Sequence, residues 1–379
     1  MQYLEYDRTK IKWQGTSPVN KTFLIAPLGK KSPIMIFNAA GQLLVKKQTN
    51  GFPAELRQLY DLSGYSYFSG TTAVGPRCAQ GYNANGRYTL GKLYITDNYL
   101  DTRKVIDYIP TPNIPKVLGL HFHGNYVLGE EHFLVQAISM EEVLVDNVKT
   151  YVVNCILQEQ LNGEVVWEWQ SIDCPELFNA SFARNEYHNQ KVLDKVYACD
   201  YAHMNSAVKT SDGKYVYISF KHIGIIKLDY STKELIWIIG PGPKTDRTLE
   251  LPKKALQFAH QHDIHLIDNN TIYFWDNSHF CYTELKVEND EIIYCSSTSY
   301  PTKCTHTVMG NAVKVSDNII DLCYGLRYPL LPHVYLQPII VEYDMETGKK
   351  LMELTIYDRS DELVNVMYQV NRGVNIYEN

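Results

Sequence analysis

The sequence predicts an all-β protein, a six-bladed β-propeller with four-stranded antiparallel blades around a central channel. The composition favours strands, a unit of four short strands recurs along the chain, and a histidine comes just before the first strand of several units. Repeated units of this kind pack side by side around one axis, so they form one ring and not several separate domains. We therefore expect residues 1–379 to form a single propeller domain.

The composition is typical of an ordered chain rich in strands. Hydrophobic residues make up 45% and charged residues 21%, and there are 29 tyrosines. Aromatic and β-branched side chains fit the pleated, half-buried surface of a sheet. The net charge of -6 and the pI near 6.1 give no reason to expect a nucleic acid or an anionic membrane as partner.

The clearest unit covers residues 202–240. It divides into the strands SAVKT, KYVYISF, GIIKLDY and ELIWIIG, with turn residues SDG and STK between them. Four short strands in about forty residues are typical of one propeller blade.

Five further units follow the same order of strands and turns, two of them clearly and three more loosely. The clear ones cover residues 261–297 and 310–357, and the looser ones residues 22–48, 62–108 and 117–170. The strand VMYQVNRGVNIYE near the C-terminus is expected to complete the first blade and remove an unpaired edge. Residues 174–196 are the least strand-like and are interpreted as a lid or an inter-blade loop.

The N-terminal fifteen residues contain no apolar stretch like that of a secretory signal, and no window resembles a membrane span. We therefore expect a cytoplasmic protein without membrane contact. The eight cysteines are far apart and form no CxxC pair, which is typical of a reducing compartment. Because zinc sites need close ligand pairs, we expect no metal and no cofactor. The oligomeric state is left open.

Four of the twelve histidines lie just before the first strand of a unit: His123, His203, His262 and His306. The innermost strand of each blade lines the channel, so these side chains are expected to converge from different blades. Neutral imidazole is a good nucleophile and imidazolium donates to anions, which suits group transfer. A structural role is expected for the tryptophans Trp167, Trp169, Trp237 and Trp275 and for the histidines His121, His132, His188, His260, His265 and His333.

Two segments, DYAHMNSAVKTSDGKYVYISFKHIGIIKLDYSTKELIWIIGPG and FAHQHDIHLIDNNTIYFWDN, resemble the arylsulfotransferases. The H-x-N-S motif, the IKLD and WIIG strand pair, and the Q-H-D motif occur in the family's order. The resemblance covers roughly Val117 to Gly325. It implies a six-bladed propeller that moves a sulfuryl group from a phenolic sulfate ester to a phenol without a nucleotide donor.

The resemblance also implies roles for individual residues. His203 and His262 match the family histidines that bind sulfuryl oxygens and shuttle the phenol proton, and His306 is the expected nucleophile, which becomes a sulfohistidine. His123 and Asn205 are expected to bind substrate. Asn205 and Asp263, next to the key histidines, could orient the imidazole rings.

One position departs from the family pattern. Where the family has an arginine, this chain reads Asp276-Asn277-Ser278-His279-Phe280. His279, the Lys221-His222 pair or Arg372 could supply the missing positive charge. Otherwise, the protein could be a non-catalytic propeller that binds a ligand or a protein, and a third interpretation is a metal-dependent hydrolase with histidine ligands.

Overall fold

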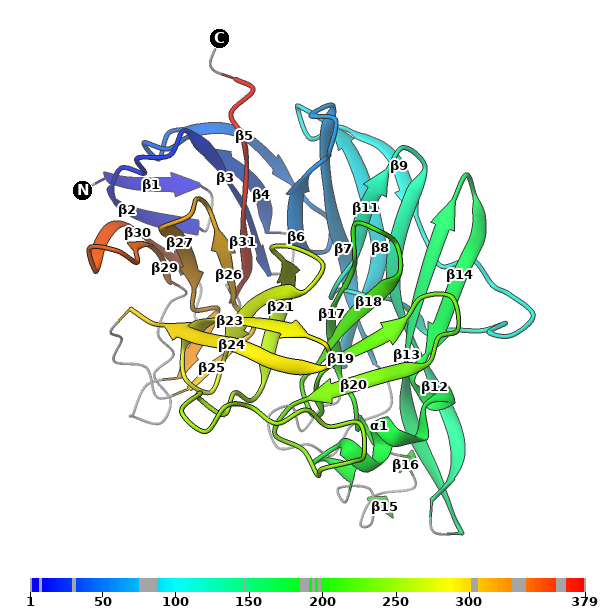
Figure 1. Cartoon of the computed structure of the whole chain (residues 1–379). Coiled ribbons are helices and arrows are strands. Elements are labelled where there is room, and N and C mark those ends of the chain that lie inside the picture. Colours follow the sequence, from blue (N-terminus) through cyan, green and yellow to red (C-terminus); the bar gives the residue numbers. More distant parts are fainter. Residues whose placement is uncertain are drawn as a thin grey trace.

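The computed structural model describes residues 2–6, 9–28, 32–74, 87–145, 147–184, 191–192, 195–196, 199–300, 306–328, 339–358 and 366–377. They form antiparallel sheets that lie around a common centre, as in a β-propeller (Figure 1). The all-β prediction is confirmed. No helix among the described residues is long and apolar enough to cross a membrane.

Three sheets are four-stranded blades of the predicted kind. The first contains β17 (Met204–Lys209), β18 (Tyr215–Phe220), β19 (Gly224–Asp229) and β20 (Leu235–Ile239). The second contains β21 (Gln261–Leu266), β22 (Thr271–Asp276), β23 (Cys281–Glu288) and β24 (Glu291–Thr298). The third has the order β31 (Val366–Val374), β3 (Lys21–Leu28), β4 (Pro33–Phe37) and β5 (Leu43–Gln48). Because β31 pairs with β3, the C-terminal strand completes the first blade, as expected.

A fourth blade has six strands. Its inner part contains β26 (Asn311–Lys314), β27 (Ile319–Cys323), β29 (Ile339–Asp344) and β30 (Lys349–Asp358). The N-terminal hairpin of β1 (Gln2–Tyr6) and β2 (Thr9–Gly15) adds to this sheet, because all of β2 pairs with Met352–Asp358 of β30. This addition covers an edge that would otherwise be open.

The remaining strands form one nine-stranded sheet. Its members are β6 (Phe52–Gln58), β7 (Gly64–Val74), β8 (Arg87–Asp97), β9 (Thr102–Ile106), β10 (Gly119–His121), β11 (Tyr126–Gly129), β12 (His132–Val145), β13 (Val148–Leu161) and β14 (Glu164–Gln170).

The count of six separate four-stranded blades is therefore wrong for the described residues, which form four discrete blades and this continuous sheet. The short strand β10 joins the sheet's two halves, because it pairs with β12 on one side and with β8 on the other. Strands β8 and β12 have 11 and 14 residues and extend beyond the usual length of a blade strand. β10 pairs with Leu90 and Gly91 of β8 and with Ala137 and Ile138 of β12.

The smaller elements lie in and around the connections. They are β15 (Lys191–Val192), β16 (Lys195–Val196), β25 (His306–Val308), β28 (Leu326–Tyr328), the 3-10 helix η1 (Ser171–Asp173) and α1 (Pro175–Ala180). Helix α1 begins with a proline at its first position, where the missing N–H costs nothing. Its Leu177 belongs to the core, and residues 185–190 and 193–194 of the predicted loop lie outside the described part.

The core consists of apolar layers between neighbouring sheets. Trp167 and Trp169 pack between β12–β14 and β17–β20, Trp237 between the first two blades, and Trp275 against the fourth blade. All four are at least nine-tenths buried, which confirms their assignment to the core.

Hydrogen bonds from side chains join the innermost segment of each unit to the next. Asn371 of β31 donates to the carbonyl of Leu56 in β6, and the Glu55 carboxylate of β6 accepts from the backbone N–H groups of Gly124 and Asn125. These bonds are buried, and each partner belongs to a different part of the ring.

The series continues round the centre. Gln136 donates to the Met204 carbonyl, Asn205 to the Gln261 carbonyl, His262 to the Gly310 carbonyl and Asn311 to the Val370 carbonyl, with donor to acceptor distances of 2.7, 2.7, 2.6 and 2.7 Å. Val370 is next to Asn371 in β31, so the series closes on itself. The inner strands therefore hold one another through polar side chains.

We predict that Asn311→Ala lowers the free energy of unfolding by about 3 kcal/mol, because Asn311 both donates to Val370 O and accepts from Val370 N in a buried site. Urea unfolding followed by tryptophan fluorescence measures the change. The control is Asn318→Ala, which removes an exposed bond to Glu346 and is expected to change stability by less than about 0.5 kcal/mol. Equal effects of the two substitutions would contradict the prediction.

Candidate functional site

A cluster of histidines lies where the inner segments meet. The ring centroid of His123 is 5.6 Å from that of His203 and 5.4 Å from that of His262, and His203 is 5.7 Å from His222. His121 stacks on His123 at 4.5 Å. We call these five residues the histidine cluster. The structure thus brings together three of the four histidines expected to converge, and adds His121, to which the sequence assigns only a structural role.

Different elements supply the members of the cluster. His121 ends β10 and His123 follows it in the loop to β11, whereas His262 is the second residue of β21. His203 directly precedes β17, and His222 lies in the turn between β18 and β19. Backbone bonds from Lys221 N to His203 O and from His222 N to Ala202 O hold that turn against the start of β17.

Burial keeps several of these imidazoles neutral. It lowers the pKa of His121 to about 3, with the charge of His203 adding to the effect. It lowers the pKa of His262 to about 4, against the opposing influence of Asp263 and of the bond to Gly310. The pKa of His123 is also well below its ordinary value, because the ring is buried and other histidines surround it. Neutral rings keep one lone pair, so they can act as nucleophiles or bases.

His203 is distinguished from the other members by a carboxylate partner. Its Nδ1 lies 2.6 Å from Oδ2 of Asp200, three residues earlier in the chain. Burial raises the pKa of Asp200, but the charge and hydrogen bond of His203 outweigh it, and the pKa is well below its ordinary value. A charged Asp200 accepts the Nδ1–H of His203 and so fixes the orientation of its ring.

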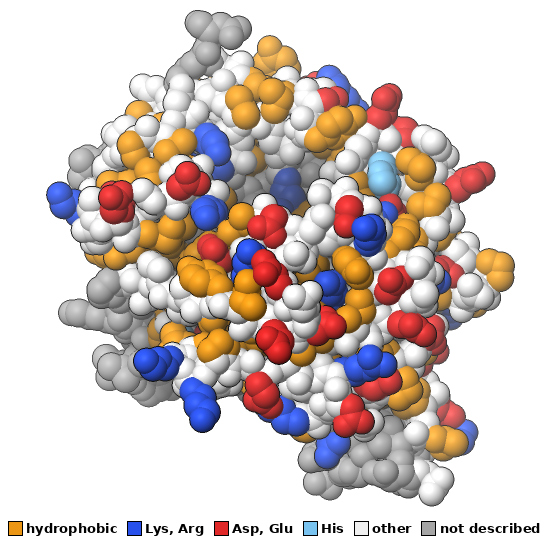
Figure 2. All heavy atoms as spheres, in the orientation of Figure 1, with side chains coloured by type: hydrophobic (Ala, Val, Ile, Leu, Met, Phe, Trp, Pro, Cys, Tyr) orange, Lys and Arg blue, Asp and Glu red, His pale blue; other side chains and the backbone are white. Residues whose placement is uncertain are grey.

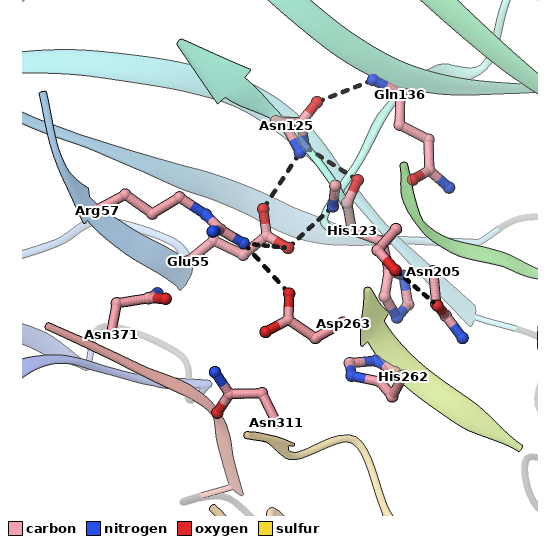
Figure 3. Close-up of polar contacts among 12 residues, drawn as sticks. Glu55, Arg57, His123, Asn125, Gln136, Asn205, His262, Asp263, Asn311 and Asn371 are labelled. Carbon is pink, nitrogen blue, oxygen red and sulfur yellow. Dashed lines mark hydrogen bonds and ion pairs between the residues drawn. The ribbon is translucent and has the colours of Figure 1, made fainter. Parts of the chain in front are cut away.

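A second polar group lies beside the cluster and comes from β6 and β21. Figure 3 shows Glu55, Arg57 and Asp263 directed toward one another, with His262 next to Asp263. The Arg57 guanidinium is 3.4 Å from Asp263 and 4.0 Å from Glu55. Burial raises the pKa of Glu55 to about 7 despite Arg57 and two backbone donors. Sequence reasoning missed this group, because nothing in the AELRQ segment distinguishes it from an ordinary strand.

The backbone is strained where these groups meet. Glu55, His203 and Asp263 have φ angles of 54°, 55° and 56°, in the left-handed region that side chains larger than glycine disfavour. The pairing register shifts at the same places, between Ala54 and Arg57, Met204 and Ser206, and His262 and His265. Such bulges redirect side chains and are common beside functional sites.

Several residues proposed from the sequence have other partners. Asn205 bonds to Gln261 and Ser206, and Asp263 pairs with His265 at 2.7 Å and with Arg57, so neither forms a hydrogen bond to a cluster histidine among the described contacts. The Nδ1 atom of His279 lies 2.6 Å from Asp276.

Arg372 belongs to a separate buried group. Its guanidinium lies 3.1 Å from Glu342 and 3.5 Å from Asp321, and it covers the Phe23 ring. The contacts described for Arg372 therefore do not place it at the cluster. The backbone of His306 lies in β25, opposite Tyr328, and its side chain is outside the described part.

Figure 2 shows that one face of the molecule is hollowed near its middle and that a basic side chain lies deep in the hollow. A ring of sheets with buried histidines at its centre defines a β-propeller-like protein whose axial side chains can bind anions and transfer protons. The comparison with protein families then gives the particular class. The arylsulfotransferase (ASST) family model matches residues 89–303, more than half of the chain, and the protein belongs to that family.

Membership of this family identifies the protein as a sulfotransferase, and the general activity of the family is aryl sulfotransfer. A search of curated proteins found no match. A protein of unknown function from Bacteroides caccae shares the fold, with a TM-score of 0.51 and 10% identity over 93% of this chain and 99% of that one.

Two further solved structures are less similar to this chain, with TM-scores below 0.5. They are a dihydro-heme d1 dehydrogenase (0.41, 11% identity, 95% of this chain and 76% of that one) and the Cps50 (Swd1) β-propeller domain of Myceliophteria thermophila (0.39, 9% identity, 92% and 100%).

We predict that His262 makes the fold sensitive to acid. Its pKa is about 4 in the folded chain, below the ordinary 6.5, so the unfolded chain takes up the proton first as the pH falls. The stabilisation is complete above pH 6.5 and is lost as the pH falls to about 4, a change of about 3 kcal/mol for this residue. Urea unfolding at several pH values measures it.

The matched variant is His262→Asn, whose amide N–H can replace the Nδ1–H donor to Gly310 and does not titrate. Its stability should therefore fall less than that of the wild type over the same range. Parallel stability curves for the two proteins would show that His262 is not the group responsible.

Proposed function

We propose that this protein transfers a sulfuryl group from a phenolic sulfate ester to an acceptor phenol through a sulfohistidine. The observation that carries the proposal is the convergence of His123, His203 and His262 from separate parts of the ring, with neighbouring centroids less than 6 Å apart. We also propose that residues 1–379 act as one domain, whose inner strands hold these rings together. The substrates would be small molecules, with no nucleotide donor.

The transfer occurs in two steps, with a sulfohistidine between them. In the first, a histidine nitrogen attacks the sulfur, the bond from sulfur to the donor oxygen breaks, and the donor leaves as a phenol after taking up a proton. In the second, the acceptor phenol loses its proton, its oxygen attacks sulfur, and the nitrogen–sulfur bond breaks. Charge spread over the sulfuryl oxygens makes positioned donors the main source of catalysis.

The hydrogen bonds of the cluster support different roles for two histidines. The neutral His262 ring donates from Nδ1 to the Gly310 carbonyl, so Nε2 carries the lone pair and can accept the acceptor phenol's proton. His203 donates from Nδ1 to Asp200, and in its protonated form it can also donate from Nε2 to a sulfuryl oxygen or to the leaving phenolate. His306 remains the proposed nucleophile from the family pattern, and we assign substrate binding to His123 and His222.

We expect the wild type with p-nitrophenyl sulfate alone to release at most one nitrophenol per chain, and to release it continuously only when an acceptor phenol is present. His306→Ala should lose turnover by roughly 1,000-fold or more, because the covalent intermediate cannot form. Intact-protein mass spectrometry with donor alone should show one added SO₃ group in the wild type and none in the variant. His132→Gln, which changes a histidine paired with Glu159 outside the cluster, is the control and should keep turnover.

Absence of acceptor-dependent release with several donors would count against the proposal. If donors then bind equally to wild type and His306→Ala without turnover, the non-catalytic ligand-binding interpretation is favoured. The observation that supports this second interpretation is the absence of the family's arginine from the segment that contains Ser278 and His279.

His203→Asn separates proton transfer from orientation. The asparagine amide can keep a hydrogen bond to Asp200 in place of Nδ1, but it cannot become a cation or move a proton. We expect kcat to fall by roughly 100-fold to 10,000-fold, the range for loss of a general acid or base. The variant should also show a steeper dependence of kcat on the pKa of the leaving phenol, because a phenolate that leaves without a proton must carry more of the charge itself. Steady-state kinetics with donors of different leaving groups measures this dependence.

A further inference from the structure

Three side chains at one edge of the histidine cluster have the composition of a metal site. One ligand atom each from Asp200, His203 and His222 lies within 4.8 Å of the other two. Asp200 and His222 are about 5% exposed, and His203 is partly exposed. The group therefore combines two buried ligands with an opening toward solvent on the His203 side.

His222 provides a second, independent observation that points to a ligand site at this place. Both of its ring nitrogens are buried, and neither has a hydrogen-bond partner among the described residues. Oδ1 of Asp200 is also buried without a described partner. Buried polar atoms are nearly always paired, and an imidazole presents at least one lone pair or N–H that must be satisfied. A cation held between these side chains would take up the His222 lone pair and a carboxylate oxygen.

The backbone holds the ligands in place before any ion binds. The turn that carries His222 is bonded to the segment that carries His203 by Lys221 N to His203 O at 3.0 Å and His222 N to Ala202 O at 3.3 Å. On its other side the His222 carbonyl accepts from Phe182 N at 3.1 Å, and the Phe182 ring packs edge-on against the imidazole. Both segments are therefore anchored, and only side-chain rotations are needed to bring the ligand atoms closer.

We infer that Asp200, His203 and His222 bind one divalent transition-metal ion of the zinc class. Two imidazoles and one carboxylate match a zinc site with three protein ligands and one open position, whereas magnesium and calcium prefer oxygen ligands. Ligand atoms around tetrahedral zinc are roughly 3.3 Å apart, so binding shortens each distance between these ligand atoms by at most about 1.5 Å. The inference concerns binding alone and does not depend on the proposed sulfuryl transfer, although His203 and His222 are shared between the two sites.

The test is titration of the chelator-treated full-length protein with Co²⁺ and Zn²⁺. We expect one ion per chain by calorimetry and a visible d–d absorption spectrum of nitrogen and oxygen ligands with Co²⁺. His222→Gln and Asp200→Asn should each weaken binding by more than the roughly 10-fold to 100-fold that follows loss of a group outside the coordination sphere. Thermal unfolding without metal shows whether each variant is folded.

The matched control is His279→Gln. His279 and Asp276 form another histidine–aspartate pair at 2.6 Å with the same three-residue spacing, but no third ligand is grouped with them among the described residues. This variant should bind Co²⁺ like the wild type. Absence of stoichiometric binding, unchanged affinity in folded His222→Gln, or intense thiolate-to-cobalt absorption that points to the free cysteines would each overturn the inference.

Discussion

The structure depends on the closed series of side-chain hydrogen bonds that joins each innermost segment to the next. A ring of sheets is stable only if its first and last parts meet, and here Asn371 and Val370 of β31 bond to opposite neighbours, β6 and β26. These bonds lie at the centre, where the sheets approach most closely and water is excluded. The same side chains that close the ring therefore fix the distances between the functional groups that the ring surrounds.

The site combines buried bases and buried acids at a cost in local stability. Imidazoles that would be partly protonated in water are neutral here, and the carboxylates of Asp200 and Asp263 remain charged because His203, His265 and Arg57 lie beside them. Glu55 has only the distant Arg57 and two backbone donors, so its pKa rises instead. Different surroundings thus give chemically similar groups different protonation states, which is the condition for acid–base chemistry at neutral pH.

His262 shows how structural and chemical roles are joined in one side chain. Its Nδ1–H is one of the bonds that close the ring, and this bond determines which nitrogen keeps the lone pair. His203 is held in another way, by a carboxylate and by a strained backbone at φ 55°. The two rings meet His123 from different directions, so the cluster presents nitrogen atoms of unlike character to one space.

The sequence by itself determined the features that depend on near neighbours in the chain. The strands of residues 202–240, the turns between them and the burial of the tryptophans follow from alternation and turn residues, which act locally. The recurrence of histidines before inner strands was also enough to predict that His123, His203 and His262 converge.

Only the tertiary structure decided what depends on register between distant strands. It joined two predicted units into a nine-stranded sheet through β10, placed Arg372 with Asp321 and Glu342, and brought Glu55 and Arg57 beside Asp263. It also brought His222 to Asp200 and His203 through backbone bonds between separate segments. A shift of one residue reverses the face to which a strand side chain points, so such contacts cannot be inferred from local patterns.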